Sequence, residues 1–263
     1  MPALILMYHD LAESTSGVDP AHRPYVLAPA VFRAQMQSAA ESSLVCSSVT
    51  DWVAAAHKPT QALVITFDDG HISNYEIALP ILLECRLRAT FFITAGRIGN
   101  GDTMNWTQIR ALHSAGMEIG SHTLTHRPPA TLDDSELRYE LSESRRILED
   151  GLGAPVTSIS SPTGFFNPRM RAIAREAGYR ALCFGRAGLA LANDDPFSLK
   201  RIAMKRTTAE DQFRALLAFD RKTICKVRAR QWLLERARSL LGVEKYIRIR
   251  RTLMNNGADA TEV

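Results

Sequence analysis

Two adjacent carboxylates follow an apolar segment in the first third of the chain. The apolar run from Ala62 to Ile65 leads within three residues to Asp68, Asp69 and Gly70. This pattern predicts a buried strand that stops at a glycine turn. Two carboxylates that reach one cleft repel each other unless a positive group lies beside them. A metal ion is the simplest such group, and a turn with solvated carboxylates is the alternative.

Two histidines four positions apart offer ligands for such an ion. His122 and His126 come directly after residues 117–121, another predicted strand. Their imidazole nitrogens suit zinc-type ions, although a chain with seven histidines can hold such a pair by chance, on its surface. With a carboxylate at a neighbouring strand end, the pair makes a three-ligand site with an open position. The second carboxylate can then act as a base toward water.

The elements that position these residues alternate along the chain. Residues 3–9 are predicted as the first strand, and residues 11–29, with Pro20, Pro24 and Pro29, as a long loop. After the strand that ends at Asp68, helices and strands take turns up to a strand at 198–204 and a helix at 209–219. This alternation predicts a parallel sheet, and roughly seven units in about 220 residues favour a barrel over a doubly wound sheet.

Composition narrows the class of protein. The chain has 263 residues, 46% of them hydrophobic, which is enough for a full core. No apolar run of about 18 residues predicts a membrane span, and the N-terminal segment lacks the basic start of a signal peptide. The four cysteines form no CxxC pair. These features predict a cytoplasmic protein with reduced thiols.

The basic charge is concentrated near the C-terminus. Residues 221–251 carry eleven lysines and arginines against two glutamates, a balance of +9 in a chain whose net charge is +4. We therefore divide the chain into a barrel at 1–220 and a basic helical extension at 221–263. The extension has three interpretations: a helix packed on the barrel, peripheral contact with the inner face of a membrane, and nucleic-acid binding. The last is not expected, because aromatic residues are few.

The two motifs together resemble a known family. The segments 66–70, Thr-Phe-Asp-Asp-Gly, and 121–126, Ser-His-Thr-Leu-Thr-His, are similar to those of the polysaccharide deacetylases of the NodB-homology type, carbohydrate esterase family 4. The resemblance covers about residues 1–215. It implies a distorted (β/α) barrel and metal-dependent N-deacetylation of sugars. It also implies that Asp68 is the general base and that Asp69, His122 and His126 bind a divalent metal ion, with Zn²⁺ as the first choice.

A third family motif, of the type Arg-x-Pro-Tyr-Gly, is only partly present. The matching segment, residues 160–164, reads Ser-Ser-Pro-Thr-Gly. The arginine that steadies the base carboxylate in the family is replaced by Ser160, so that another cation must act here or Asp68 is tuned differently. The backbone N–H of Thr163 remains a candidate for holding the oxyanion.

The family pattern also supplies a late histidine as general acid, and this chain has no histidine after His126. His9 is our candidate, because it ends the first predicted strand and therefore lies on the face that holds Asp68 and His122. A Tyr-His pair at this place also resembles the deacetylases of exopolysaccharide biosynthesis. The alternative for His9 is a histidine that caps the core. His71 is interpreted as a rim residue, and no role is assigned to the histidines at 22, 57 and 113.

These inferences predict a hydrolase that removes N-acetyl groups from an amino-sugar polysaccharide or from its precursor, which can be lipid-linked. A carbohydrate-binding pseudoenzyme of the same fold is the alternative, favoured by the incomplete third motif. Trp106 is a weak candidate for stacking on a sugar ring and equally a packing residue.

Overall fold

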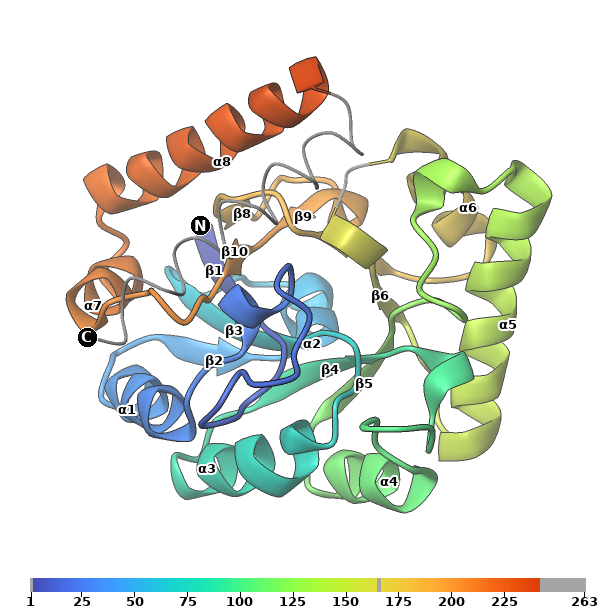
Figure 1. Cartoon of the computed structure of the whole chain (residues 1–263), viewed down its shortest axis with the longest axis horizontal. Coiled ribbons are helices and arrows are strands. Elements are labelled where there is room, and N and C mark those ends of the chain that lie inside the picture. Colours follow the sequence, from blue (N-terminus) through green and yellow to red (C-terminus); the bar gives the residue numbers. More distant parts are fainter. Residues whose placement is uncertain (1, 165–166, 242–263) are drawn as a thin grey trace.

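A nearly closed barrel of parallel strands forms the body of the protein (Figure 1). The computed structural model describes residues 2–164 and 167–241. Along the sheet, the strands follow the order β10 (Ile202–Ala203), β1 (Pro2–Tyr8), β3 (Ala62–Phe67), β4 (Ala89–Ile93), β5 (Glu118–Ser121), β6 (Ser158–Ser160), β7 (Ala181–Phe184) and β9 (Leu199–Lys200). Strand β2 (Val45–Ser47) pairs with β3 in parallel, and β8 (Ala190–Leu191) pairs with β1 antiparallel. The predicted distorted barrel is confirmed.

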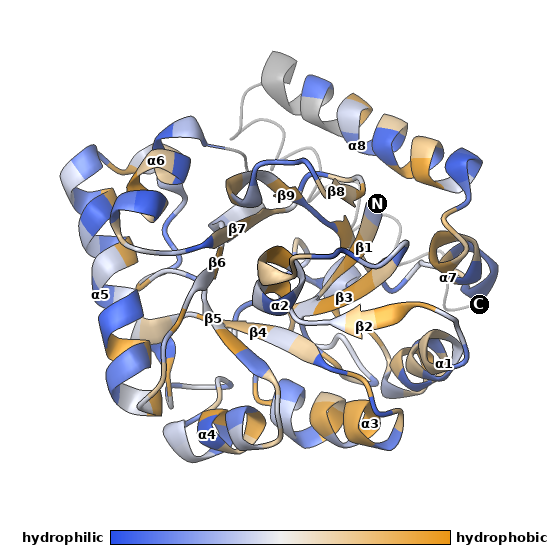
Figure 2. Cartoon of the chain, turned by 180° about the vertical axis from the view of Figure 1, so that it is seen from behind, coloured by the Kyte–Doolittle hydropathy of each residue, from blue (hydrophilic) through white to orange (hydrophobic). Residues whose placement is uncertain are grey.

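Helices surround the strands on the outside (Figure 1). They are α1 (Pro29–Ala40), α2 (Val49–Ala54), α3 (Leu79–Glu84), α4 (Trp106–Ser114), α5 (Asp134–Leu152), α6 (Pro168–Glu176), α7 (Glu210–Leu217) and α8 (Arg221–Leu241). Local sequence explains where several begin: Asn105 and Asp133 each start a capping box, with Gln108 and Glu136 as the reciprocal partners. Figure 2 shows hydrophobic strands β1 and β4 in the centre and many hydrophilic residues on α5 and α8.

Alternation along the strands divides the core into two layers. Ala3 and Ile5 of β1 and Ala62 and Val64 of β3 lie inside the barrel with Trp52 of α2, which covers the end where the strands begin. The residues between them face the helices and join the larger cluster. Because side chains alternate with a period of two, the positions that continue the inner face beyond the strand ends are 9 on β1 and 68 on β3.

The seam of the barrel lies at a single residue. The predicted strand 198–204 is divided into β9, which pairs with β7, and β10, which pairs with β1, and only Arg201 separates them. One bent segment thus joins the two ends of the sheet. Arg201 is fully buried, so its side chain fills the interior at the seam.

Two further elements complete the described part of the chain. The helical segment that contains α3 begins as a π-helical turn, Asn74–Ala78. Helix α8 begins at Arg221, where the basic extension was expected to start, and Ile224 packs into the core. Among residues 2–164 and 167–241, no helix is both long and apolar enough to cross a bilayer. The extension beyond residue 241 lies outside the described residues, and the domain division and peripheral membrane contact stay predictions.

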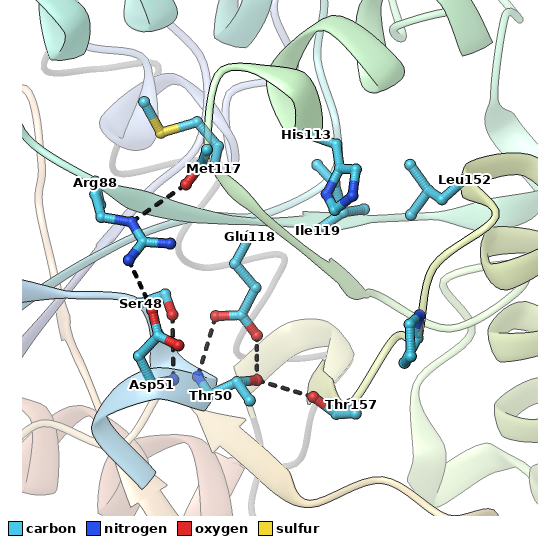
Figure 3. A pocket seen from close by; sticks show the side chains of 12 residues that line it. Ser48, Thr50, Asp51, Arg88, His113, Met117, Glu118, Ile119, Leu152 and Thr157 are labelled. Atoms are coloured by element: carbon cyan, nitrogen blue, oxygen red, sulfur yellow. Dashed lines mark hydrogen bonds and ion pairs between the residues drawn. The ribbon is translucent and has the colours of Figure 1, made fainter. Parts of the chain in front are cut away.

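The end of the barrel where the strands begin is closed by a polar network around Glu118 (Figure 3). Its carboxylate accepts hydrogen bonds from the backbone N–H of Thr50 at 3.1 Å, from the Thr50 hydroxyl, from Thr90 at 2.7 Å and from Ser158 at 2.6 Å. A cavity of about 240 Å³ opens beside it. The network links α2, β4, β5 and β6 at the end of the barrel away from Asp68.

We expect the substitution Glu118→Gln to lower the free energy of unfolding by about 2 kcal/mol, because an NH₂ group replaces an oxygen that accepts two hydrogen bonds and the remaining bonds lose their charged acceptor. Denaturant unfolding of the wild type and the variant measures this difference. Glu76→Gln, on an exposed residue of the π-helical turn, is the control and should leave stability unchanged. Equal stability of Glu118→Gln and the wild type would contradict a structural role for the network.

Candidate active site

The carboxyl ends of the strands bring together side chains that are far apart in the sequence. His9 follows β1, Asp68 follows β3 and His122 follows β5, while Ser160 ends β6 and Arg201 lies at the seam. All five continue the inner face of their strands. The parity of each strand therefore directs these polar groups into the upper part of the barrel, above the apolar layer.

Asp69, His122 and His126 form one cluster. Oδ1 of Asp69 lies 3.3 Å from Nε2 of His122 and 3.2 Å from Nε2 of His126. The three potential ligand atoms lie within 4.8 Å of one another. Asp69 reaches this position through a left-handed backbone (φ 74°), which turns it away from the alternation that points Asp68 into the barrel. The two adjacent carboxylates therefore lie in different surroundings: Asp69 contacts the two histidines, and Asp68 points into the barrel.

The loop that carries His126 is held by a carboxylate that the sequence analysis did not single out. Glu140 of α5, almost fully buried, accepts hydrogen bonds from the backbone N–H groups of Leu124 and Thr125, each at 2.9 Å, and from the Thr125 hydroxyl. Thr123 and His126 both have left-handed backbones in this loop. Glu140 therefore compensates N–H groups that a tight loop would leave unpaired.

The tautomer of His122 follows from its other nitrogen. Nδ1 lies 3.0 Å from the backbone oxygen of Ser160, which can only accept, so Nδ1 carries the proton. Nε2 is therefore the nitrogen that faces the cluster. A hydrogen bond of this kind orients a metal-binding histidine and makes it a better ligand. Burial alone would lower the pKa of His122, but Asp68 and Asp69 outweigh it and raise this pKa in the absence of a metal ion.

This cluster fits a divalent cation. Oδ1 of Asp69 is buried and has no hydrogen-bond partner in the described part of the chain, and the Nε2 contacts are at ion-pair distance. Burial alone would raise the pKa of Asp69, but His122 and His126 outweigh it and hold this pKa well below its usual range. A carboxylate that stays ionised between two imidazoles matches a metal site of three protein ligands.

Arg201 pairs with the second carboxylate. Its guanidinium donates to Oδ1 and Oδ2 of Asp68, both at 2.7 Å, and both residues are buried. The other donors reach Thr66 (3.1 Å), Ser160 (2.7 Å) and the backbone oxygen of Phe184 (3.3 Å), so all five N–H groups of the arginine are used.

This geometry sets the charge of Asp68. Burial alone would raise the pKa of Asp68, but the charges of Arg201 and His122 and the hydrogen bonds from Arg201 hold it below its usual value. The hydroxyl of Ser160 adds a hydrogen bond to Oδ2 at 3.2 Å. Arg201, at the seam of the barrel, therefore supplies the positive charge that the family motif would place at position 160.

His9 lies beside these carboxylates with one nitrogen unused. Its backbone oxygen accepts from Nδ2 of Asn74 at 2.8 Å, while its own Nδ1 is buried without a hydrogen-bond partner among the described residues. Burial lowers the pKa of His9 below 6.5, although Asp69 and Asp68 partly oppose this effect. The ring is therefore mainly neutral at neutral pH.

The weaker candidates lie differently. Thr163 has a left-handed backbone (φ 60°) in the turn after β6 and is exposed. Trp106 packs against Gly151 of α5, where an added Cβ would lie 2.1 Å from its ring, and Arg110 covers the ring. We therefore leave Trp106 out of the proposed site. Nδ1 of His71 lies 2.7 Å from the hydroxyl of Ser73, so His71 is hydrogen-bonded outside the cluster of Asp69, His122 and His126.

Comparison with known proteins assigns the fold and the family. Residues 55–182 match the family described as polysaccharide deacetylase. The chain carries a polysaccharide deacetylase domain. The domain begins before β3 and ends within β7, so that it includes both the Asp68–Asp69 pair and the His122–His126 pair.

Individual relatives agree with this assignment. YxkH of Bacillus subtilis is 27% identical over 161 residues, which cover 61% of this chain and 58% of that protein. The poly-beta-1,6-N-acetyl-D-glucosamine N-deacetylase of Staphylococcus aureus is 25% identical over 136 residues, 46% of this chain and 47% of that enzyme. The Streptococcus pyogenes deacetylase PplD has the same fold, with a TM-score of 0.72, 22% identity, and coverage of 80% of this chain and 96% of that one.

The chain thus spans about half the length of these two curated relatives. The family assignment confirms the resemblance deduced from the two motifs. The comparisons give no support to the alternative of a carbohydrate-binding pseudoenzyme.

We expect the deacetylase domain to bind one equivalent of Zn²⁺. The variant His126→Ala should bind Zn²⁺ at least about 100-fold more weakly, because loss of a residue that binds the metal directly costs no less affinity than loss of a residue that only hydrogen-bonds to a metal ligand. Titration against a chelating indicator measures both affinities. His71→Ala removes a neighbouring histidine and should bind Zn²⁺ as the wild type does. Wild-type affinity in His126→Ala would exclude this residue as a ligand.

Proposed function

We propose that this chain is a metal-dependent hydrolase that removes N-acetyl groups from an amino-sugar polysaccharide or from its precursor. One observation carries the proposal: three ligand atoms converge within 4.8 Å beside a carboxylate held ionised by a buried arginine. The similarity to the poly-beta-1,6-N-acetyl-D-glucosamine N-deacetylase of Staphylococcus aureus supports a polymer of N-acetylglucosamine as the substrate class.

The proposed metal ligands are Asp69, His122 and His126, and zinc is the first choice because of this nitrogen-rich donor set. Bound there, a divalent cation would polarise the acetamide carbonyl and the water that attacks it. The N–H of Thr163 is a candidate second donor to the oxyanion.

Two groups move protons in this scheme. Asp68 takes the proton of the attacking water as general base, and its orientation is fixed by the two-pronged contact with Arg201. His9 gives a proton to the leaving amine as the C–N bond breaks. Arg201 does not touch the substrate, so it is a positioning residue that acts through Asp68.

We expect the zinc-loaded wild type to release acetate from oligomers of N-acetylglucosamine, and Asp68→Asn to lower kcat by about 10²–10⁴-fold, because an amide cannot accept the proton. Acetate release measures kcat and KM, and metal analysis checks that the variant stays loaded. Asp102→Asn, an exposed carboxylate at the rim, should retain activity. A loaded wild type that is inactive on every N-acetylated glycan would contradict the proposed function.

A second expectation concerns the arginine. Arg201→Lys keeps the charge but loses the two-pronged contact, so kcat should fall by about tenfold or more while KM changes little. Arg201→Met leaves a buried carboxylate unpaired and should cost about 3–5 kcal/mol of stability.

Acetate release measures the first effect and denaturant unfolding the second. Arg186→Lys, on an exposed arginine beside the seam, is the control. An unchanged kcat in Arg201→Lys would show that the geometry of the contact does not position Asp68.

A further inference from the structure

The long loop between β1 and α1 folds over the mouth of the barrel at His9. It is fixed at its base by paired backbone hydrogen bonds, from Leu27 to the oxygen of Asp10 (3.0 Å) and from Ala12 to the oxygen of Leu27 (2.9 Å). Farther along, the N–H of Arg206 donates to the oxygen of Pro24 at 2.8 Å. The loop is thus held both by the segment that follows β1 and by the segment that follows β10.

This loop brings two rings against His9. The centroid of His22 lies 5.6 Å from that of His9 with the planes at 80°, and the centroid of Tyr25 lies 5.0 Å away. Sequence reasoning gave His22 no role, because nothing near residue 22 indicates which surface the loop contacts. Its position next to the proposed acid requires an explanation.

His22 has the partner that His9 lacks. Its Nε2 lies 2.8 Å from Oδ2 of Asp10, the residue directly after His9. Asp10 keeps 15% of its side-chain exposure and His22 keeps 31%. The hydrogen bond between Asp10 and His22 is therefore partly protected from water, and His22 can still exchange protons with solvent. Nδ1 of His9, in contrast, is buried without a hydrogen-bond partner among the described residues.

The pKa values of the two histidines are shifted in opposite directions for this reason. The hydrogen bond to Asp10 raises the pKa of His22 above its usual 6.5, against the opposing effect of burial. Burial lowers the pKa of His9. The ionisable groups that act on His22 or face it are Asp10, Asp69, Asp19, His9 and Tyr25, with Lys205 over the Tyr25 ring.

The ring of His9, whose pKa is lowered by burial, thus lies against the ring of His22, whose contact with Asp10 favours its protonated form. We propose that the Asp10–His22 pair supplies the proton that His9 delivers to the leaving amine. The proposal rests on the proposed function and deepens it. In each turnover one proton leaves His22 and reaches His9. It ends on the amine nitrogen as the C–N bond breaks, and solvent returns a proton to His22.

His22 acts through His9 in this scheme and does not touch the substrate. A purely structural role, in which the pair only fixes the loop, is the competing explanation. The two can be separated by the leaving group, because an amine must be protonated to depart, whereas a phenolate with a low pKa departs without a proton.

The experiment compares two substrates in zinc-loaded protein: an oligomer of N-acetylglucosamine and 4-nitrophenyl acetate. For His22→Gln we expect kcat on the oligomer to fall about 10²-fold, the usual contribution of a proton donor, while hydrolysis of the ester stays as in the wild type. The double variant His9→Gln/His22→Gln should be no slower than His9→Gln alone, because both residues serve one step. His57→Gln, on an exposed histidine before β3, is the matched control.

A pH profile gives a second readout. Asp10→Asn removes the group that keeps His22 charged, so His22 loses its proton at a lower pH. The alkaline limb of kcat/KM for the oligomer should therefore move to lower pH than in the wild type. A residue that only fixes the loop would change the height of the profile and leave this limb in place.

The possible outcomes are distinct. Equal loss on both substrates, full activity of His22→Gln on the oligomer, or an unmoved alkaline limb in Asp10→Asn would each overturn this proposal alone. A wild type that binds zinc and releases acetate from no N-acetylated glycan would overturn the proposed function and this proposal with it.

Discussion

The buried ion pair between Asp68 and Arg201 is the contact on which the upper half of the barrel depends. It joins β3 to the seam between β9 and β10, across 133 residues of sequence. Taking two charges out of water is costly, and the cost is offset only when every donor and acceptor finds a partner. Here all five N–H groups of the arginine are used, and Ser160 contacts both members of the pair.

Ser160 also connects this pair to the metal cluster. Its hydroxyl bonds to Asp68 and Arg201, and its backbone oxygen accepts from Nδ1 of His122. A small side chain leaves room for the guanidinium that arrives from the opposite strand. An arginine at this position would compete for the same carboxylate, which gives a physical reason why the third family motif departs from its pattern here.

Local sequence was sufficient to bring Asp69, His122 and His126 together as candidate ligands, because they follow strand ends and parallel strands end on one face. Arg201 was missed because no local pattern reports a contact with a residue so distant. One signal was available: the basic pair Lys200 and Arg201 interrupts a segment, between Leu199 and Ile202, that otherwise has the pattern of a buried strand. Charged residues are almost never fully buried unless they are paired, so a partner for Arg201 could have been sought.

Other differences have similar causes. Glu140 and His22 act through tertiary contacts of a helix and a loop, and sequence spacing does not encode which loop they meet. Trp106 begins α4 as an aromatic residue at a loop–helix junction, a pattern that fits both packing and sugar binding; only the contact with Gly151 distinguishes them.

The position of the seam also bears on how the protein is made. The segments that bear Asp68, Asp69, His122 and His126 precede the seam, so a ribosome delivers them well before Arg201 arrives. Until the seam closes, the carboxylate of Asp68 has no guanidinium beside it and the barrel has an open edge between β1 and β7. A partly synthesised chain can therefore bring the proposed metal ligands together, but it cannot hold the proposed base in place. Catalytic competence would then appear late in synthesis, together with closure of the barrel.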